Sequence, residues 1–166
     1  LDPHFLPMEQ FCRGYLKNAK QPIAIAIERN KGHISVYDTF IHGTPEMEQA
    51  DFFYIERIVK FLLWAKGGFR VIICGNKAVY DHIKQTYSVK GARAFDNKTM
   101  SDVYENDFEV CNVKYEQKPQ QHDVSSPLGG HMDGCRIGFD AGGSDRKVSA
   151  VMDGQALYSE EVVWHP

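Results

Sequence analysis

The residue types best suited to chemistry lie close together near the end of the chain. They are an acid, three small residues and a base, in the order Asp140, Gly142, Gly143, Ser144 and Lys147. Paired glycines let backbone N–H groups approach phosphate oxygens closely, and a neighbouring acid can hold a metal ion or its water. The stretch therefore predicts a nucleotide-phosphate site. The alternative is an ordinary hairpin with a glycine-rich turn, because short glycine patterns also arise by chance.

The elements that would position these residues are short strands. An apolar run ends at Asp140, a Gly-Gly-Ser turn follows, and a second strand covers residues 147–152. Asp153 and Gly154 are typical of a tight hairpin turn, after which a third strand runs to about Trp164. We therefore expect three consecutive strands joined by two turns.

Residues 134–164 resemble the first phosphate motif of the superfamily of sugar kinases, heat-shock chaperones and actin. The closest likeness is to the ROK family of bacterial sugar kinases and repressors, which opens with a strand, Asp-x-Gly-Gly-Thr and a second strand. Asp140, Gly142 and Gly143 match this pattern, and Ser144 replaces the threonine. The resemblance implies an actin-like ATPase (ribonuclease H-like) fold that binds ATP and magnesium. Asp140 would serve the metal, and the Gly-Gly-Ser loop with Lys147 would serve the phosphates.

Other parts of the family pattern are missing from this sequence. The family places a catalytic Asp, a Glu-x-Gly-His sugar motif and a cysteine-rich zinc motif downstream of the first motif, and we assign no catalytic residue here. The resemblance thus implies the N-terminal part of a larger sugar kinase, inactive by itself and without a tightly bound cofactor. The alternative function is a non-catalytic regulatory or self-association module on an actin-like scaffold with a degenerate nucleotide site. The sugar stays unidentified.

Residues 1–115 have the pattern of an α/β domain. The expected fold is a mixed sheet built from β-hairpins with flanking helices. The expected elements are a helix over 8–18, a hairpin over 22–41, a helix over 45–66, a strand over 69–74, helices over 77–87 and 99–106, and a strand over 108–115. Residues 90–97 are expected to form a loop.

Hydrophobic spacing predicts which side chains are buried. In the hairpin, Ile23, Ile25 and Ile27 alternate with alanines, and Ile34 and Val36 are expected to point inward. The helix over 45–66 is expected to be capped by Thr44, to bury its aromatic residues with its aliphatic stripe, and to end at Gly67-Gly68. The aromatic residues in question are Phe52, Phe53, Phe61 and Trp64.

Residues 116–133 are rich in polar, proline and glycine residues, which predicts a linker. We expect residues 134–166 to be the opening strands of a ROK-like ATPase domain, docked on residues 1–115 as extra strands.

Two further positions are weaker candidates. Glu28 falls where Asp140 falls when the two hairpins are superposed by sequence, but a solvated turn at Glu28-Arg29 is the favoured interpretation. Gly75-Asn76 follows a buried strand and opens a helix, so its N–H groups could bind an anion, although an ordinary strand-to-helix turn is favoured.

Composition narrows the class of protein. The chain has 166 residues, 43% of them hydrophobic, and a formal net charge of −3, so there is no basic excess to favour nucleic acid. No apolar run has the length of a membrane span. Four scattered cysteines and seven histidines show no metal-ligand spacing, and reduced, buried thiols indicate a cytoplasmic protein. A sugar substrate and homo-oligomer formation are the partner expectations.

Overall fold

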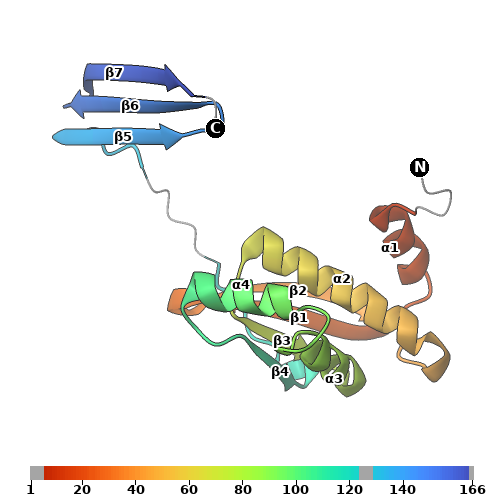
Figure 1. Cartoon of the computed structure of the whole chain (residues 1–166). Helices are drawn as coiled ribbons and strands as arrows, with labels where there is room; N and C mark the ends of the chain where they lie inside the picture. Colours follow the sequence, from red (N-terminus) through yellow and green to blue (C-terminus); the bar gives the residue numbers. More distant parts are fainter. Residues whose placement is uncertain (1–5, 124–128, 165–166) are drawn as a thin grey trace. The chain divides into compact units, whose positions relative to one another are not determined.

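The computed structural model describes residues 6–123 and 129–164, which fall into two compact units, Leu1–Val124 and Ser125–Pro166. The first unit is a mixed α/β fold with a four-stranded sheet, and the second is a three-stranded antiparallel sheet (Figure 1). The α/β expectation and the order of elements in the first unit are confirmed. Its elements are α1 (Met8–Leu16), β1 (Gln21–Arg29), β2 (His33–Ile41), α2 (Glu48–Lys66), β3 (Arg70–Cys74), α3 (Lys77–Thr86), α4 (Ala94–Tyr104) and β4 (Glu109–Val113).

The sheet of the first unit has the strand order β2-β1-β3-β4. β1 pairs antiparallel with both β2 and β3, and only β3 and β4 are parallel. The β1–β2 hairpin turns through a short 3-10 segment, Asn30–Gly32, in which Lys31 and Gly32 have φ of 63° and 70°. The parallel pair is joined by α3 and α4, because parallel strands need a long crossover.

One face of the sheet and the helices form the core. Ile23, Ile25 and Ile27 are fully buried and belong to one apolar cluster with α2 side chains such as Ile55 and Leu63. Each fully buried side chain of this size contributes roughly 1.5–3 kcal/mol relative to leaving it in water. The inward direction predicted for the β1 isoleucines is confirmed.

The prediction for the inward face of β2 is wrong. The buried residues of this strand are Ser35, Thr39 and Ile41, whereas Ile34 and Val36 lie on the opposite face, outside the apolar core cluster. Thr39 fits the core because its hydroxyl is 2.7 Å from the hydroxyl of buried Tyr54. A tertiary hydrogen bond thus removes the cost of burying a polar side chain.

Helix α2 differs from the expectation at its start and on its surface. A 3-10 turn, Pro45–Met47, precedes it, and Thr44 makes no side-chain capping hydrogen bond. Phe53, Phe61 and Trp64 are 45%, 66% and 51% exposed, so most of the aromatic stripe lies outside the core. The helix ends as expected at Gly67, where φ is 73°.

Helix α4 begins earlier than expected. It takes in residues 94–97, for which a loop was expected. The backbone of Arg93 donates to the carbonyl of Thr86 and accepts from Asn97, so the end of α3 fixes the first turn of α4. The early start of α4 therefore depends on tertiary contacts, which the local sequence pattern does not predict.

The helix-free face of the sheet is crossed by residues 115–123, which we call the strap. Its first turn, Tyr115–Gln117, contacts β1 and β3. Its end pairs with the outer edge of β2 through two 2.8 Å backbone hydrogen bonds between His122 and Ile34. Ala24 and Ala26 are fully buried on this face. Residues 116–123, expected to be linker, therefore belong to the first unit.

The second unit is a meander of β5 (Cys135–Ala141), β6 (Asp145–Met152) and β7 (Gln155–Val163). The three expected strands and the turn at Asp153 and Gly154 are confirmed. These strands form a three-stranded sheet of their own, and the expected docking of this unit on the first domain stays a prediction. The two hairpins that resemble each other in sequence thus stand in different sheets.

The cysteines are only partly buried. Cys74 is buried, Cys12 and Cys111 are half-buried, and Cys135 is exposed, so the expected burial holds for part of the set. All four are free thiols. Among the helices of the described residues, none has the length and apolar character required to cross a membrane.

Candidate phosphate site on the second unit

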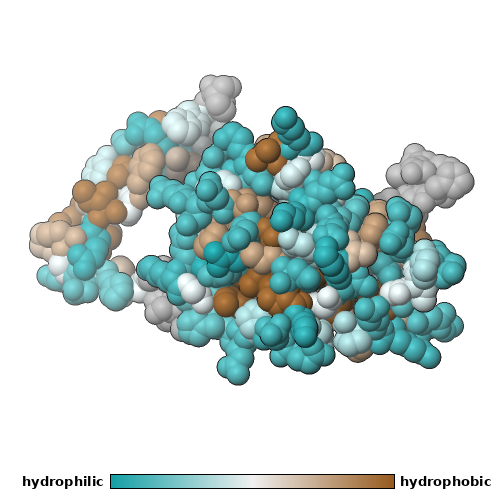
Figure 2. All heavy atoms as spheres, turned by 90° about the horizontal axis from the view of Figure 1, so that it is seen from below, coloured by the Kyte–Doolittle hydropathy of each residue, from teal (hydrophilic) through white to brown (hydrophobic). Residues whose placement is uncertain are grey.

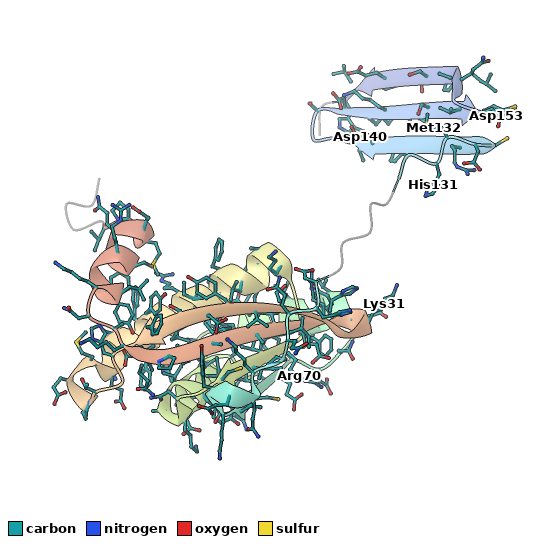
Figure 3. The ribbon with its side chains drawn as sticks, turned by 180° about the vertical axis from the view of Figure 1, so that it is seen from behind. Lys31, Arg70, His131, Met132, Asp140 and Asp153 are labelled. Carbon is teal, nitrogen blue, oxygen red and sulfur yellow. The ribbon has the colours of Figure 1, made fainter. Side chains whose placement is uncertain are left out.

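The β5–β6 hairpin brings the predicted acid and base together. Asp140 lies near the end of β5 and is the cross-strand partner of Lys147 on β6. Residues directly opposite in an antiparallel pair point to the same face, with Cβ atoms about 5 Å apart. Figure 3 shows Asp140 beside the β5–β6 turn, with Asp153 at the opposite end of this sheet. The hairpin register therefore places both groups next to the Gly-Gly-Ser turn.

The turn is closed by hydrogen bonds that define which groups are free. The amide of Gly142 donates to the carbonyl of Asp145 at 2.8 Å. Trp164 donates its amide to the Ser144 carbonyl at 3.0 Å and its indole N–H to the Gly142 carbonyl at 3.1 Å. Among the described residues, the amides of Gly143 and Ser144 have no acceptor. These two N–H groups are the donors that the turn can offer to an anion.

The two glycines of this turn differ in the space around them, and neither has an unusual backbone angle. A Cβ at Gly142 would lie 2.9 Å from a carboxylate oxygen of Asp145, whereas one at Gly143 would meet no atom within 4 Å. Neither residue has a positive φ. The first glycine therefore allows the close approach of Asp145, and the second leaves its surroundings open.

The strand register divides the sheet into a polar and an apolar face. On the polar face, Gly138, Ser149 and Ser159 form one cross-strand row of small residues. The next row, which we call the charged row, consists of Asp140, Lys147 and Glu161. An open groove of about 400 Å³ is lined by five residues of these rows and by two of their strand neighbours: Gly138, Asp140, Lys147, Ser149 and Ser159, with Phe139 and Val148. Small side chains thus leave room beside charged ones, which is what a polar ligand requires.

Carboxylates outnumber cations around the charged row. The ammonium of Lys147 lies 3.4 Å from Asp145 and 3.7 Å from Glu161, and the attraction of first Asp145 and then Glu161 raises the pKa of Lys147. This net negative surface would repel a bare phosphate, whereas magnesium bound to the phosphate would offer the carboxylates a cation. The residues present fit the magnesium-bound form, with Asp140 as the carboxylate next to the turn.

The five predicted residues of the site lie together at one end of one hairpin. The structure adds the row of small residues on the polar face and two acids beside Lys147 that sequence reasoning missed. They are Gly138, Ser149, Ser159, Asp145 and Glu161. Counting residues outward from the β5–β6 turn would have found Gly138 and Ser149. The same count along β7 would have missed Ser159 and Glu161, because a bulge between Ala150 and Val151 shifts the register by one residue.

The other candidates are occupied by structural contacts. Glu28 accepts from Arg70 at 2.7 Å, so this counterpart of Asp140 is part of an ion pair on the sheet. Asn76 caps α3 by accepting from the Val79 amide at 3.0 Å, and the Gly75 amide donates to Val113. Gly75-Asn76 is therefore the ordinary strand-to-helix turn. Within residues 6–123 and 129–164, no cluster of three metal-ligating side chains occurs.

A larger hollow, of about 640 Å³, lies beside α4 in the first unit, but three of its polar side chains are already engaged. Asn97 donates to the Tyr87 carbonyl at 2.7 Å, and the Ser101 hydroxyl accepts from the Phe108 amide at 3.1 Å. Lys98 pairs with Asp102 at 2.6 Å. The groove of the second unit is smaller, yet Asp140 and Lys147 line it, so we take it as the candidate site.

Comparisons with known proteins found no relative of this chain. No family model, no curated protein and no solved structure matches the chain.

Proposed function

We propose that the β5–β6 hairpin is the first phosphate-binding element of a ROK-like sugar kinase. In this proposal Asp140 faces the magnesium of a bound ATP, Lys147 attracts the phosphates, and the amides of Gly143 and Ser144 donate to phosphate oxygens. The observation that carries the proposal is the cross-strand pair Asp140–Lys147 beside a turn with two free amides. Magnesium-ATP supplies the transferable phosphoryl group.

The hairpin provides one side of such a site. Phosphoryl transfer needs a base, a metal and several phosphate ligands arranged around the nucleotide. The described residues offer the metal-facing carboxylate and the phosphate donors, and Asp140, Gly143, Ser144 and Lys147 are all exposed. We therefore expect binding of the nucleotide without transfer of phosphate by these residues alone.

A second function is favoured by the shape of the turn. Successive amides converge on an anion when right-handed and left-handed residues alternate, and neither Gly142 nor Gly143 has a positive φ. The Gly142 amide is moreover taken by Asp145. These features suit a non-catalytic regulatory or self-association module that keeps a degenerate nucleotide site.

Calorimetric titration with magnesium-ATP separates the two functions. For the kinase-like function we expect measurable binding, which Asp140→Asn and Lys147→Ala should each weaken at least tenfold, or about 1.4 kcal/mol. A chelator of magnesium should abolish the heat, because the charged row repels a triphosphate without its metal. Binding that depended on Lys147 but survived the chelator would contradict the role of the metal.

The matched control is Asp133→Asn. It removes one carboxylate from the same unit at a largely exposed position that precedes β5. Its affinity for magnesium-ATP should equal that of the wild type. A flat trace for the wild type, or equal weakening by Asp133→Asn and Asp140→Asn, would favour the non-catalytic module.

A further inference from the structure

The second unit has strands but no core. Between residues 129 and 164 no residue is buried. A three-stranded sheet needs a covered hydrophobic face to be stable, and small units without one rely on disulfides or metals. Cys135 is a free thiol, and no metal-ligating cluster occurs among the described residues. The fold of this unit therefore requires a surface that covers it.

The surface to be covered is the face opposite Asp140 and Lys147, which we call the apolar face. The strand register places four rows on it: Ala141 with Arg146 and Val162, Phe139 with Val148 and Glu160, Ile137 with Ala150 and Tyr158, and Cys135 with Met152 and Gln155. Ile137 is 81% exposed and Phe139 66% exposed. Figure 2 shows hydrophobic residues of this unit in brown at its surface.

We propose that the apolar face packs against the apolar face of a second copy of the chain, forming a two-layer sandwich of six strands. Three strands about 4.8 Å apart, each seven to nine residues long, give a face of roughly 14 Å by 25 Å. Two such faces have about 700 Å² of flat area, and with the relief of their side chains they bury on the order of 1,000 Å² of accessible surface in total, which is the lower bound for a specific interface.

The pattern of side chains on the apolar face is self-complementary. A two-fold axis that lies between the two faces, perpendicular to the strands, places the row of Phe139 opposite the row of Ile137 of the second copy. The same operation sets the carboxylate of Glu160 against the hydroxyl of Tyr158 of the second copy, which gives the one acid of these rows a hydrogen-bond donor. Arg146, at the turn end of the face, lies far from Arg146 of the second copy.

This packing is independent of the proposed nucleotide site. Asp140 and Lys147 lie on the other face, which remains open in the sandwich. Dimer formation can therefore be measured separately from nucleotide binding, and a failure to bind nucleotide would not count against the dimer.

The test is sedimentation of the full chain with two substitutions of equally exposed residues. Phe139 and Val163 are both 66% exposed, but Val163 is the partner of Asp145 on the polar face. The wild type and the Val163→Asp variant should sediment as dimers, with twice the 18.9 kDa mass of one chain. Phe139→Asp should sediment as a monomer, and the amides of its β5–β7 strands should lose their protection from hydrogen exchange.

The helices of the first unit control for general misfolding, because their amides should stay protected in all three proteins. A monomeric wild type overturns the proposal, and so does a Phe139→Asp variant that remains dimeric.

Discussion

At the scale of single residues, Asp51 links three elements of the first unit. This buried carboxylate accepts from the hydroxyl of Tyr15 at 2.5 Å and from the amides of His42 and Gly43 at 3.1 and 2.8 Å. It thereby ties α1 and the end of β2 to the first turns of α2. Burial and the acceptor Asp51 together raise the pKa of Tyr15, so the phenol stays protonated and continues to donate.

We expect Asp51→Ala to lower the free energy of unfolding of the first unit by about 3 kcal/mol or more, since it leaves three donors without an acceptor. The measurement is urea unfolding followed by helical circular dichroism, because all helices of the described residues lie in the first unit. Asp81→Ala is the control: Asp81 is an exposed partner of Lys77 on α3, and its loss should cost within about 0.5 kcal/mol. Equal losses in the two variants would refute the role of Asp51.

At the scale of elements, the strap is held by charge as well as by backbone pairing. Arg29 forms an ion pair with Asp123, and the Ser35 hydroxyl donates to the same carboxylate at 3.1 Å. The guanidinium of Arg29, and then Ser35, lower the pKa of Asp123. An acid with a lowered pKa stabilises the folded state above its ordinary pKa, and this stabilisation is lost as the pH falls through the lowered value.

The strap should therefore open in acid before the sheet does. As the pH falls below about 4, the usual range of an aspartate, the amides of Ile34 and His122 should lose hydrogen-exchange protection, whereas those of β1 should keep it. In the Asp123→Asn variant the protection of these amides should no longer change with pH in this range. This result would attribute the pH dependence to the Asp123 carboxylate. Unchanged protection of Ile34 across this range would show that the ion pair does not hold the strap.

Most elements of the first unit could be predicted from sequence, because hydrophobic periodicity and Gly-Gly or Asn turns are local signals. The parts that could not be predicted depend on distant partners. Ser35 and Thr39 face inward because Asp123 and Tyr54 satisfy their hydroxyls. The strap has the composition of a linker, yet its contacts with β1 and β2 are tertiary. Neither the partners of these hydroxyls nor the contacts of the strap can be predicted from local patterns of composition and hydrophobicity.

The candidate site also has parts that the local sequence predicts and parts that depend on distant residues. Asp140, Lys147 and the turn between them could be found from the sequence, because all lie in one hairpin. The full closure of the turn could not, since the carbonyls of Gly142 and Ser144 accept from Trp164, which follows the far end of β7. The alternating apolar residues of the second unit are visible in the sequence, but their exposure is visible only in the structure.

At the scale of the whole molecule, the chain combines a unit with a complete core and a unit without one. The first unit buries its sheet under helices on one face and under the strap on the other. The second unit presents a charged groove on one face and an apolar surface on the other. We propose that the charged face binds magnesium-ATP and that the apolar face packs against a second copy of the chain.

The proposed phosphate site is tested most directly by an amide NMR titration of the full chain with magnesium-ATP. We predict that the resonances of Gly143 and Ser144 shift most, because their N–H groups would donate to the phosphates. Those of Asp153 and Gly154, in the turn at the other end of the sheet, should stay in place. Shifts of equal size at both turns, or no shift at Gly143 and Ser144, would contradict the assignment of a phosphate site to this hairpin.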